Sequence, residues 1–346
     1  MPELPEVETI KRGLAATVLG KTIRDVEVRL PKIVSLGPAV VSNIRRSGGK
    51  KVGKFRKFLK NLKVESVKRR GKMLVLKLSK APSLFRRLPA GRQGGEAQPP
   101  LHLPLSKKGE KREGVARARG EGNMVLLIHL KMTGQLIYAK SGERKEVKVF
   151  NTQASPRLAL PHKYTHVIFD FADGSHLYFN DLRQFGYLRL VGDNALEQVR
   201  EFREYGPEPL SARFSLAYLL ERASRRPNLS VKQFLMEPKV VAGIGNIYSD
   251  EILYWAGIRP NRKVRTLKKP EWQKIYQVIP RVLKKALAAR GSSVGDFFQV
   301  DGTEGKFGRQ HMVYGRAGEK CKKCGTIVKS LKLGGRTSSY CPKCQK

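Results

Sequence analysis

The chain has 346 residues, and 69 Lys and Arg against 29 Asp and Glu give it a formal net charge of +40. A chain this basic repels itself unless it meets a polyanion, so we expect a nucleic-acid partner, although a salt-tolerant surface or a ribosome-bound protein would also be basic. At ~100–200 residues per domain, the length predicts two domains with small appendages. A hydrophobic content of 40% suffices for real cores and argues against wholesale disorder.

Neither a membrane span nor an export signal is predicted. The strongest apolar run, residues 124–130, is far shorter than the ~18 residues that a membrane helix needs, and His129 within it favours a buried strand. Glu3, Glu6 and Glu8 occupy the region where a signal peptide would have its apolar core. All four cysteines lie in the last 26 residues, which does not suggest a disulfide framework. We therefore expect a cytoplasmic protein that makes no membrane contact.

The first predicted element is a helix over residues 4–20. Pro5 suits its first turn, nearby carboxylates favour the positive end of the helix dipole, and Gly20 can end it. Eight segments of β character follow, several with the alternation typical of half-buried strands. They are residues 22–30, 62–68, 73–78, 124–130, 135–139, 166–171, 176–180 and 186–190.

Beyond Asp193 the hydrophobic period becomes that of helices. Helices are predicted over residues 195–205, 216–224, 231–237, 246–256 and 272–289. Pro280 should kink the last of them, because proline lacks the amide that the helix ladder needs.

These elements predict an α+β fold with three parts: an N-terminal antiparallel β-sandwich domain over residues 1–192, a helical domain over 193–308 and a small metal-bound tip over 309–346. Residues 79–123 interrupt the β-rich part between two apolar strands. They hold ten basic and four acidic residues but few large apolar ones, so we expect a disordered insertion. Its charge could add non-specific contact with nucleic acid, but an insertion without function is the simpler interpretation.

The cysteines form two pairs, Cys321-x2-Cys324 and Cys341-x2-Cys344, separated by sixteen residues. This spacing matches a tetrahedral site for one structural Zn²⁺, and a redox pair or an iron–sulfur cluster is the alternative. The segment between the pairs should form a hairpin whose turn carries Arg336 in a strongly basic stretch. We expect this hairpin to contact DNA, with a purely structural zinc ribbon as the alternative.

The N-terminal segment contains a candidate nucleophile. A small second residue permits removal of the initiator methionine, which would expose the secondary amine of Pro2. An α-amine has a pKa of about 7.7–8, against about 10.4 for lysine, so more of it is unprotonated near neutrality. Its attack on a sugar C1′ would give an iminium that acidifies the neighbouring carbon, while adjacent carboxylates move protons. Taken alone, however, an N-terminal proline is more often part of a tail.

Residues 1–9 are followed, in order along the chain, by five further distinctive segments: residues 69–72, 129–134, 180–186, 241–248 and 313–344. Together with the N-terminus, these segments make the sequence resemble bacterial formamidopyrimidine-DNA glycosylases, which excise 8-oxoguanine and cleave abasic sites. The five segments resemble the family's catalytic-lysine segment, the loop with its void-filling methionine, its intercalating loop, its helix–two-turn–helix signature and its zinc finger. The resemblance covers nearly the whole chain outside residues 79–123, and it implies that the helical domain is a helix–two-turn–helix domain.

Carried over by position, the resemblance implies that Pro2 is the Schiff-base nucleophile, Glu3 the proton donor at the sugar ring and Glu6 a group that orients the site. Lys72 would be the proton donor for β-elimination, and Arg336 would assist the second elimination. These roles suit the chemistry, because a departing group needs a proton and a guanidinium matches a phosphate geometrically.

The resemblance also implies a wedge that enters DNA. Met132, Arg183 and Phe185 would fill the gap left by an extruded nucleotide, where an apolar group beside a cation offsets part of the lost stacking. Ordinary core packing is the alternative for the two apolar side chains.

Phosphate contacts are expected from Asn246, at a helix start within a glycine-rich turn, from Lys232, and from Arg226 together with Arg225. The glycine-rich residues 291–308 resemble the family's flexible lesion-capping loop, whose backbone amides would recognise the oxidised purine. Backbone recognition leaves little trace in the residue types, so the base preference is the least specified expectation.

Three positions depart from the family pattern. Gln184 replaces a common second arginine, which should weaken one phosphate contact. Tyr164 stands where a DNA-contacting histidine is common, and the nearby His166 is interpreted as a strand residue. Leu182 replaces a frequent proline of the wedge loop.

The sequence therefore predicts a bifunctional DNA glycosylase and abasic-site lyase of base-excision repair. It would act as a monomer on double-stranded DNA with an oxidised purine, in the nucleoid of a bacterial cytoplasm. An endonuclease VIII-like glycosylase for oxidised pyrimidines is the closest alternative, although residues 4–9 favour the purine enzyme. A non-catalytic zinc-finger DNA-binding protein is disfavoured because Pro2, Glu3 and Lys72 are all present.

Overall fold

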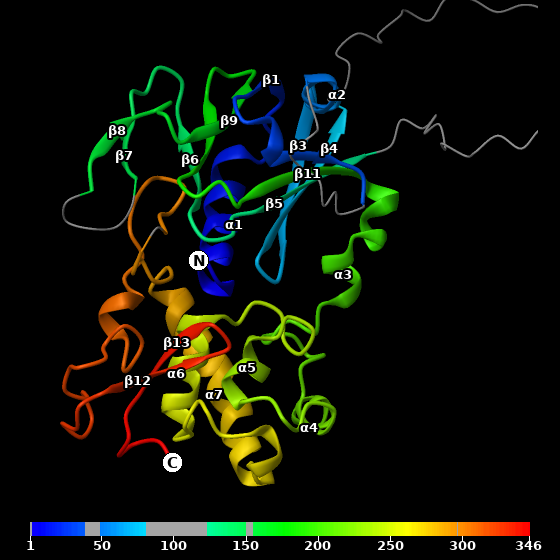
Figure 1. Cartoon of the computed structure of the whole chain (residues 1–346). Helices are drawn as coiled ribbons and strands as arrows, with labels where there is room; N and C mark the ends of the chain where they lie inside the picture. The colour runs from blue at the N-terminus through cyan, green and yellow to red at the C-terminus, as the bar shows by residue number, and fades with distance from the viewer. Residues whose placement is uncertain (1, 39–48, 81–122, 150–154, 296) are drawn as a thin grey trace, which may run out of the picture.

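The computed structural model describes residues 2–38, 49–80, 123–149, 155–295 and 297–346. These residues form a β-rich half and a helical half that also carries the C-terminal hairpin, and the N-terminus lies between the two halves (Figure 1). This arrangement confirms the predicted α+β class. None of the helices within the described ranges has the length and hydropathy needed to cross a membrane.

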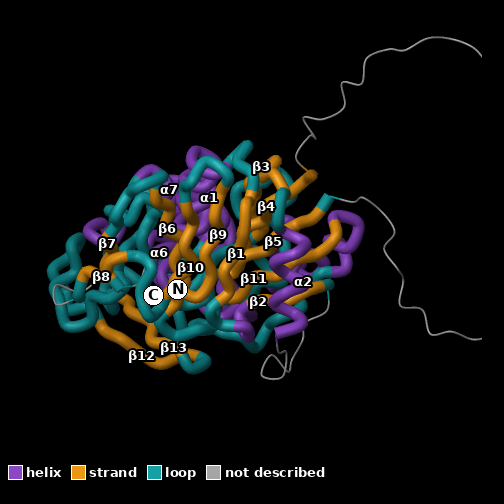
Figure 2. Tube along the Cα trace, turned by 90° about the horizontal axis from the view of Figure 1, so that it is seen from above, coloured by secondary structure: helices purple, strands orange, loops and turns teal. Residues whose placement is uncertain are grey.

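Helix α1 (Leu4–Val18) and two sheets build the β-rich half. The first sheet has the order β1-β9-β10-β6, with strands β1 (Ile23–Val28), β9 (Thr165–Phe171), β10 (His176–Asp181) and β6 (Gly134–Ala139). The second has the order β2-β11-β5-β4-β3, with strands β2 (Val34–Leu36), β11 (Tyr187–Gly192), β5 (Met124–His129), β4 (Met73–Lys80) and β3 (Leu62–Arg70). The two sheets are seen from above in Figure 2.

Strand pairing is antiparallel with one exception among the named strands, since β2 runs parallel to β11. After β1 the chain passes through the 3-10 turn η1 (Pro31–Ile33) into the other sheet, and β2 then forms a three-residue edge. The prediction of an antiparallel sandwich is therefore right for the body of both sheets and incomplete at this edge.

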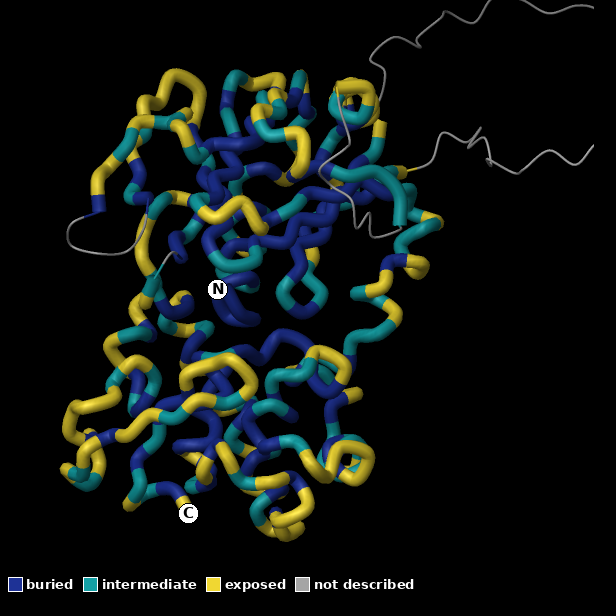
Figure 3. Tube along the Cα trace, in the orientation of Figure 1, coloured by how far each residue is buried: buried dark blue, intermediate teal, exposed yellow. Residues whose placement is uncertain are grey.

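The sandwich core has a continuous apolar interior to which α1 contributes one face. Val7, Ile10, Leu14 and Val18 of α1 are fully buried, at the spacing of one helical stripe. They belong to the same apolar cluster as residues of both sheets, and Figure 3 shows the strands buried beneath exposed loops. At its N-terminal end the buried face of α1 leads directly into Glu3.

Besides η1 and β2, this half contains three more elements that were not predicted: α2 (Gly49–Leu59), β7 (Glu146–Lys148) and β8 (Arg157–Ala159). Helix α2 is rich in lysine and buries only Phe55 and Leu59, so its apolar stripe is too sparse to indicate a helix.

Strand β4 extends to Lys80, and Leu78 pairs with Met124 of β5. The strands that flank the insertion therefore do pair, and Ser79 and Lys80 belong to β4 rather than to the insertion. Of the predicted disordered insertion over residues 79–123, residues 81–122 lie outside the described residues.

The helical half contains η3 (Asp193–Gln198), α3 (Arg200–Glu204), α4 (Leu216–Ser224), α5 (Val231–Met236), α6 (Asn246–Ala256), η4 (Val264–Thr266), α7 (Lys269–Ala288) and η5 (Phe307–Gln310). The predicted helix over 195–205 is divided because Val199 adopts an extended conformation between η3 and α3. Pro280 lies within α7, which is continuous over 20 residues. Strands β12 (Lys329–Leu333) and β13 (Arg336–Tyr340) form the C-terminal hairpin.

Candidate active site and zinc centre

The N-terminal ends of α1 and α6 meet at a buried carboxylate. Glu3, only 1% exposed, is the N-cap of α1, and its carboxylate accepts hydrogen bonds from the amides of Ile247 (2.8 Å) and Tyr248 (3.4 Å) in the first turn of α6. A helix N-terminus presents free N–H groups and partial positive charge, which suits an anionic acceptor. Pro2 is buried immediately before Glu3, so this contact places Pro2 beside α6.

Gly245, the residue before α6, shows how tightly the site is packed. A Cβ atom built at Gly245 would lie 2.4 Å from Cδ of Glu3 and 2.6 Å from Nζ of Lys72. The two side chains therefore converge on one point of the backbone. With φ −137° and ψ −150° the residue is extended, so glycine is needed here for space and not for an unusual backbone conformation.

Glu6 is a second buried carboxylate that ties together three segments of the site. It accepts hydrogen bonds from the amide of Glu3 (2.9 Å), the hydroxyl of Tyr248 (2.5 Å) and the amide of Ser292 (2.8 Å). Burial, and then the nearby charge of Glu3, raise the pKa of Glu6 above its ordinary value. These three contacts connect Glu6 to the N-cap of α1, to α6 and to the segment that follows α7.

Lys72 follows Gly71 in the turn between β3 and β4, where Arg70 pairs with Met73. Burial lowers the pKa of Lys72, while the carboxylates of Glu3 and Glu6 act in the opposite direction. With its pKa lowered, the Lys72 ammonium gives up its proton more readily than the ammonium of a solvated lysine does.

Arg336 lies at the tip of the β12–β13 hairpin, next to two glycines. Gly334 and Gly335 have φ of +53° and +74°, a pair of positive values that a tight two-residue hairpin turn requires. Arg336 is exposed, and its charge contributes to lowering the pKa of Lys72. The charge of Arg336 at the hairpin tip is thus close enough to Lys72 to act on it.

Two acidic residues of α6 hold the hairpin and its approach. Asp250 accepts hydrogen bonds from the hydroxyl of Ser338 (2.6 Å) and the amide of Ser339 (3.0 Å). Glu251 accepts hydrogen bonds from three successive amides, those of residues 312–314, at 2.9 to 3.0 Å. The position of Arg336 is therefore fixed from the same helix that receives Glu3.

The structure corrects the expectation for Lys232. Its side chain is fully buried, and its ammonium donates hydrogen bonds to Asp250 (2.7 Å) and to the carbonyl oxygen of Thr337 (3.3 Å). A phosphate contact would need the ammonium at the surface, so Lys232 does not have the predicted role. It neutralises the buried Asp250 instead.

Met132, Arg183 and Phe185 lie together at the surface, as the wedge prediction requires. A guanidinium nitrogen of Arg183 is 3.1 Å from Sδ of Met132, and its Cζ lies 4.9 Å from the ring centroid of Phe185. Phe185 is 53% exposed and Met132 is half-buried, so core packing does not account for Phe185.

Asp181 fixes the two loops that carry these side chains. Its carboxylate accepts hydrogen bonds from the hydroxyl of Thr133, which adjoins Met132, and from the amide of Gly186 (2.6 Å), which adjoins Phe185. The hydroxyl of Thr133 in turn accepts the amide of Arg183 at 3.0 Å. The wedge is therefore held by a buried polar network beneath it.

The expected phosphate-binding residues occupy different settings. Asn246 is half-buried as the first residue of α6, whereas Arg226 is exposed and pairs with Glu237 (3.3 Å). Arg225 is exposed as well and pairs with Glu221 at 2.5 Å. These exposed arginines are available to phosphates through exchange of weak surface ion pairs.

The departures from the family pattern lie near the wedge. Gln184 has φ +57°, a conformation that the wedge loop imposes. His166 is a buried strand residue of β9, as expected, with Nε2 2.8 Å from the carbonyl oxygen of Asp181.

Residues 291–308, the expected lesion-capping segment, bridge the two halves. Phe297, Phe298 and Val300 are buried against the sandwich, whereas Phe307 belongs to the helical core. Val294 is 48% exposed, although Ser292, two residues before it, is buried.

The four cysteines form the expected metal centre. Their sulfur atoms all lie within 4.8 Å of one another, with separations of 3.9 Å (Cys321–Cys344) and 3.5 Å (Cys324–Cys341). Four thiolates at about 2.3 Å from a tetrahedral Zn²⁺ would be about 3.8 Å apart. The donor set therefore fits one structural zinc ion, and the site closes the base of the β12–β13 hairpin.

Sequence reasoning missed the acidic residues that assemble this region, namely Asp181, Asp250 and Glu251. The available signal was their rarity, because a chain with 29 acidic and 69 basic residues has few carboxylates to bury without a purpose.

Comparison with known proteins identifies three matching domain families along the chain. Residues 1–188 match the formamidopyrimidine-DNA glycosylase N-terminal domain, residues 205–297 the formamidopyrimidine-DNA glycosylase H2TH domain, and residues 318–346 a zinc finger found in FPG and IleRS. Two similar curated proteins are the formamidopyrimidine-DNA glycosylases of Pelotomaculum thermopropionicum (33% identical, covering 100% of this chain and 99% of the relative) and Carboxydothermus hydrogenoformans (34%, 100% of both).

Solved structures with the same fold include DNA complexes of Lactococcus lactis Fpg. A variant bound to DNA containing Fapy-dG is 25% identical with a TM-score of 0.74, and each chain is covered completely. A complex with DNA containing an abasic site has 25% identity and a TM-score of 0.73, with 99% of each chain covered. A third holds DNA with an oxidised pyrimidine, again at 25% identity, a TM-score of 0.73 and complete coverage of both chains.

Proposed function

Because this chain belongs to the formamidopyrimidine-DNA glycosylase family of DNA-repair enzymes, we propose that it excises oxidised purines from double-stranded DNA and then cleaves the strand at the resulting abasic site. The observation that carries this proposal is the convergence of the Glu3 and Lys72 side chains on Gly245. Glu3 directly follows Pro2 in the chain. The amine of Pro2, the carboxyl group of Glu3 and the amine of Lys72 would therefore lie close together at the start of α6.

The first step uses the N-terminal amine. After removal of Met1, the nitrogen of Pro2 attacks C1′ of the damaged nucleotide, the C1′–N bond to the base breaks, and the base leaves with a proton. Glu3 protonates the sugar-ring oxygen as the C1′–O4′ bond opens, which leaves a cationic iminium between Pro2 and C1′. The amides of α6 that bind Glu3 place its carboxyl group for this transfer.

The elimination steps need acids at the departing phosphate oxygens. The iminium draws electrons from C2′, which loses a proton as the C3′–O bond breaks, and Lys72 donates the proton that the leaving oxygen takes up. In a second elimination the conjugated iminium lets C4′ lose a proton as the C5′–O bond breaks, and the guanidinium of Arg336 would stabilise the charge on the departing phosphate. A zinc ion held by Cys321, Cys324, Cys341 and Cys344 would keep the hairpin that carries Arg336 folded.

DNA binding would combine the wedge with the positive field of the protein. Met132, Arg183 and Phe185 would replace the extruded nucleotide in the stack, since their side chains are adjacent and outward. Asn246 and Arg226 would bind flanking phosphates. We also propose a monomeric enzyme of the bacterial cytoplasm, with domains at 1–192, 193–308 and 309–346.

Borohydride trapping tests this function. The protein is incubated with duplexes that contain 8-oxoguanine, an oxidised pyrimidine or an abasic site, and the reduced covalent adduct and the cleaved strand are measured separately. We expect an adduct on the purine lesion and on the abasic site, and strand cleavage that Lys72→Ala slows at least tenfold. Lys68→Ala is the matched control, because Lys68 is an exposed lysine of β3, the strand that leads into the turn before Lys72.

Three outcomes would contradict the proposal in different ways. The absence of any adduct would exclude lyase chemistry through Pro2. An adduct on the abasic site with none on the purine would exclude the purine specificity, and a preference for the pyrimidine would assign the endonuclease VIII-like activity instead. Equal cleavage by Lys72→Ala and Lys68→Ala would remove Lys72 from the elimination.

A further inference from the structure

A carboxylate from the helical half holds the turn that precedes Lys72. Glu208 lies just beyond α3, and its side chain accepts hydrogen bonds from the amide of Gly71 (2.6 Å) and from a guanidinium nitrogen of Arg69 (2.7 Å). These contacts join segments 137 and 139 residues apart in the sequence. Both Glu208 and Arg69 are largely shielded from water, with side chains 22% and 12% exposed.

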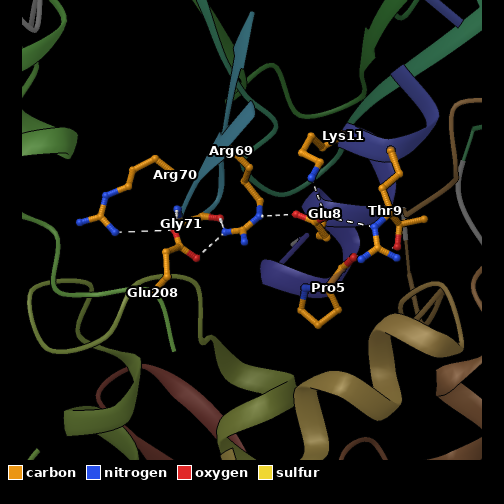
Figure 4. Close-up of polar contacts among 9 residues, drawn as sticks. Pro5, Glu8, Thr9, Lys11, Arg69, Arg70, Gly71 and Glu208 are labelled. Atoms are coloured by element: carbon orange, nitrogen blue, oxygen red, sulfur yellow. Dashed lines mark hydrogen bonds and ion pairs between the residues drawn. The ribbon is translucent and has the colours of Figure 1, made fainter. Parts of the chain in front are cut away.

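Arg69 continues the network to α1. Its Nε donates to Glu8 at 3.2 Å, while a terminal nitrogen donates to the carbonyl oxygen of Gly71 at 2.9 Å. Glu8 also binds Lys11 at 2.7 Å on the same helix, and these two ion pairs lower its pKa although burial acts against them. Figure 4 shows the chain of contacts from Glu8 through Arg69 to Glu208, with Gly71 between the last two.

Arg70 adds a second attachment of the same turn. Its guanidinium donates hydrogen bonds to the carbonyl oxygens of Tyr205 (2.8 Å) and Gly206 (2.9 Å), which precede Glu208 by three and two residues. Gly71 has φ +58°, and a Cβ atom there would lie 3.1 Å from the ring of Tyr205. The turn is thus bound to the helical half at residues 69, 70 and 71 in succession.

The attachment matters because Lys72 is a long side chain on a short turn. Its ammonium reaches Gly245 and Glu3 only if the backbone of residues 71 and 72 stays at a fixed distance from α1 and α6. A misplacement of ~1 Å in a reacting group can reduce a rate ~100-fold. Hydrogen bonding of the Gly71 amide, directly before Lys72, is the most local way to prevent such movement.

We propose that Glu208 is a positioning residue for the elimination step, which holds the Gly71 turn so that Lys72 stays at the reacting sugar. Arg69 joins this contact to α1, and so keeps Lys72 in register with Pro2 and Glu3. The inference rests on the proposed role of Lys72 in the elimination. Gly71 and Arg69 occupy both carboxylate oxygens of Glu208, so its effect is exerted through these two residues.

The test compares two isosteric variants of the same linker. In Glu208→Gln one carboxylate oxygen is replaced by an NH₂ group, so either the amide of Gly71 or the guanidinium of Arg69 loses its hydrogen-bond acceptor. Glu204→Gln is the matched control, because it changes a carboxylate of α3 that binds Arg200 and Lys239 instead. Single-turnover reactions on abasic-site duplexes give the rate of borohydride-trapped adduct and the rate of strand cleavage. We expect Glu208→Gln to keep the adduct rate within about twofold and to slow cleavage at least tenfold, while Glu204→Gln changes neither.

A double-mutant cycle separates positioning from a general loss of stability. If Glu208 acts through Lys72, then Glu208→Gln should slow cleavage no further in a Lys72→Ala background. Additive losses would overturn the inference, as would equal cleavage by Glu208→Gln and Glu204→Gln, or a parallel fall of adduct and cleavage rates together with the melting temperature. Normal cleavage by Lys72→Ala alone would instead show that the proposed role of Lys72 is wrong, and the inference would fail with it.

Discussion

Replacing Gly245 with alanine is the most direct test of the geometry at the site. The added methyl carbon would lie 2.4 Å from Cδ of Glu3, whereas carbon atoms in contact need about 3.5 Å. The carboxylate, the lysine amine or the backbone must therefore move by about 1 Å. A displacement of this size costs roughly 100-fold in rate, or about 2.7 kcal/mol in the barrier.

The assay is the single-turnover rate of base excision on a duplex with one 8-oxoguanine, together with the melting temperature of the variant. Overpacking of this kind costs about 1–3 kcal/mol of stability, so the variant should melt a few degrees lower but remain folded at 25 °C. Because Gly245 has an extended backbone that alanine can adopt, the loss of rate should come from crowding of Glu3 and Lys72 alone.

Gly53→Ala is the control, since a methyl group at Gly53 in α2 meets no atom within 4 Å. It should leave excision unchanged and stabilise the helix by up to about 1 kcal/mol. If Gly245→Ala excised the base within threefold of the unchanged protein, the close approach of Glu3 and Lys72 at α6 would not be needed for catalysis, and the reasoning would be refuted.

Three further predictions follow from the zinc centre, the buried ion pair and a buried histidine. Cys324→Ser should lower the zinc content measured by metal analysis and weaken DNA binding in gel shifts, and unchanged binding would show that the hairpin is dispensable. Lys232→Met should leave the charge of Asp250 without its counterion. The free energy of unfolding, measured with denaturant, should fall by about 3–5 kcal/mol. For DNA binding by this variant, the slope of the logarithm of the binding constant against the logarithm of the salt concentration should stay the same, because Lys232 makes no phosphate contact. Loss of a phosphate contact would reduce the magnitude of this slope by about 0.9. Burial lowers the pKa of His129 to about 3, so the unfolded chain binds the proton more tightly than the folded protein between pH 3 and 6.5. The free energy of unfolding should therefore fall on acidification through this window by up to about 1.4 kcal/mol per pH unit. Urea titrations of His129→Gln should show a weaker dependence of this free energy on pH. An unchanged dependence would contradict the assignment to His129.

Where the sequence carried strong local signals, the predicted elements agree closely with the structure. Helix α4 occupies the predicted residues 216–224 because Ser215 caps it, with the Ser215 hydroxyl accepting the amide of Tyr218. Helix α6 ends as expected because Gly257 adopts a left-handed conformation at φ +75°. Both boundaries depend on residues within one helical turn, and such signals can be found without a structure.

The misassigned lysine shows where local reasoning stops. Lys232 precedes Asp250 by eighteen residues, and nothing in the spacing shows that the two side chains meet inside the protein. A lysine in a basic chain is expected at the surface, and only the packing of α5 against α6 reverses that expectation. Glu208 was overlooked for the same reason, because its partners Gly71 and Arg69 are more than 130 residues away.

The segment that bridges the two halves has a consequence for how the protein is made. Phe297 and Val300 are buried in the sandwich core, where Val300 packs on Gly13 and its carbonyl oxygen accepts the amide of Tyr138 at 2.8 Å. Burying two such side chains contributes on the order of 3–6 kcal/mol. During synthesis, part of the apolar surface of the sandwich therefore stays uncovered after β11 is made, until more than a hundred further residues have left the ribosome. A nascent chain stalled after β11 would expose that surface to chaperones, and one stalled well beyond residue 300 would not.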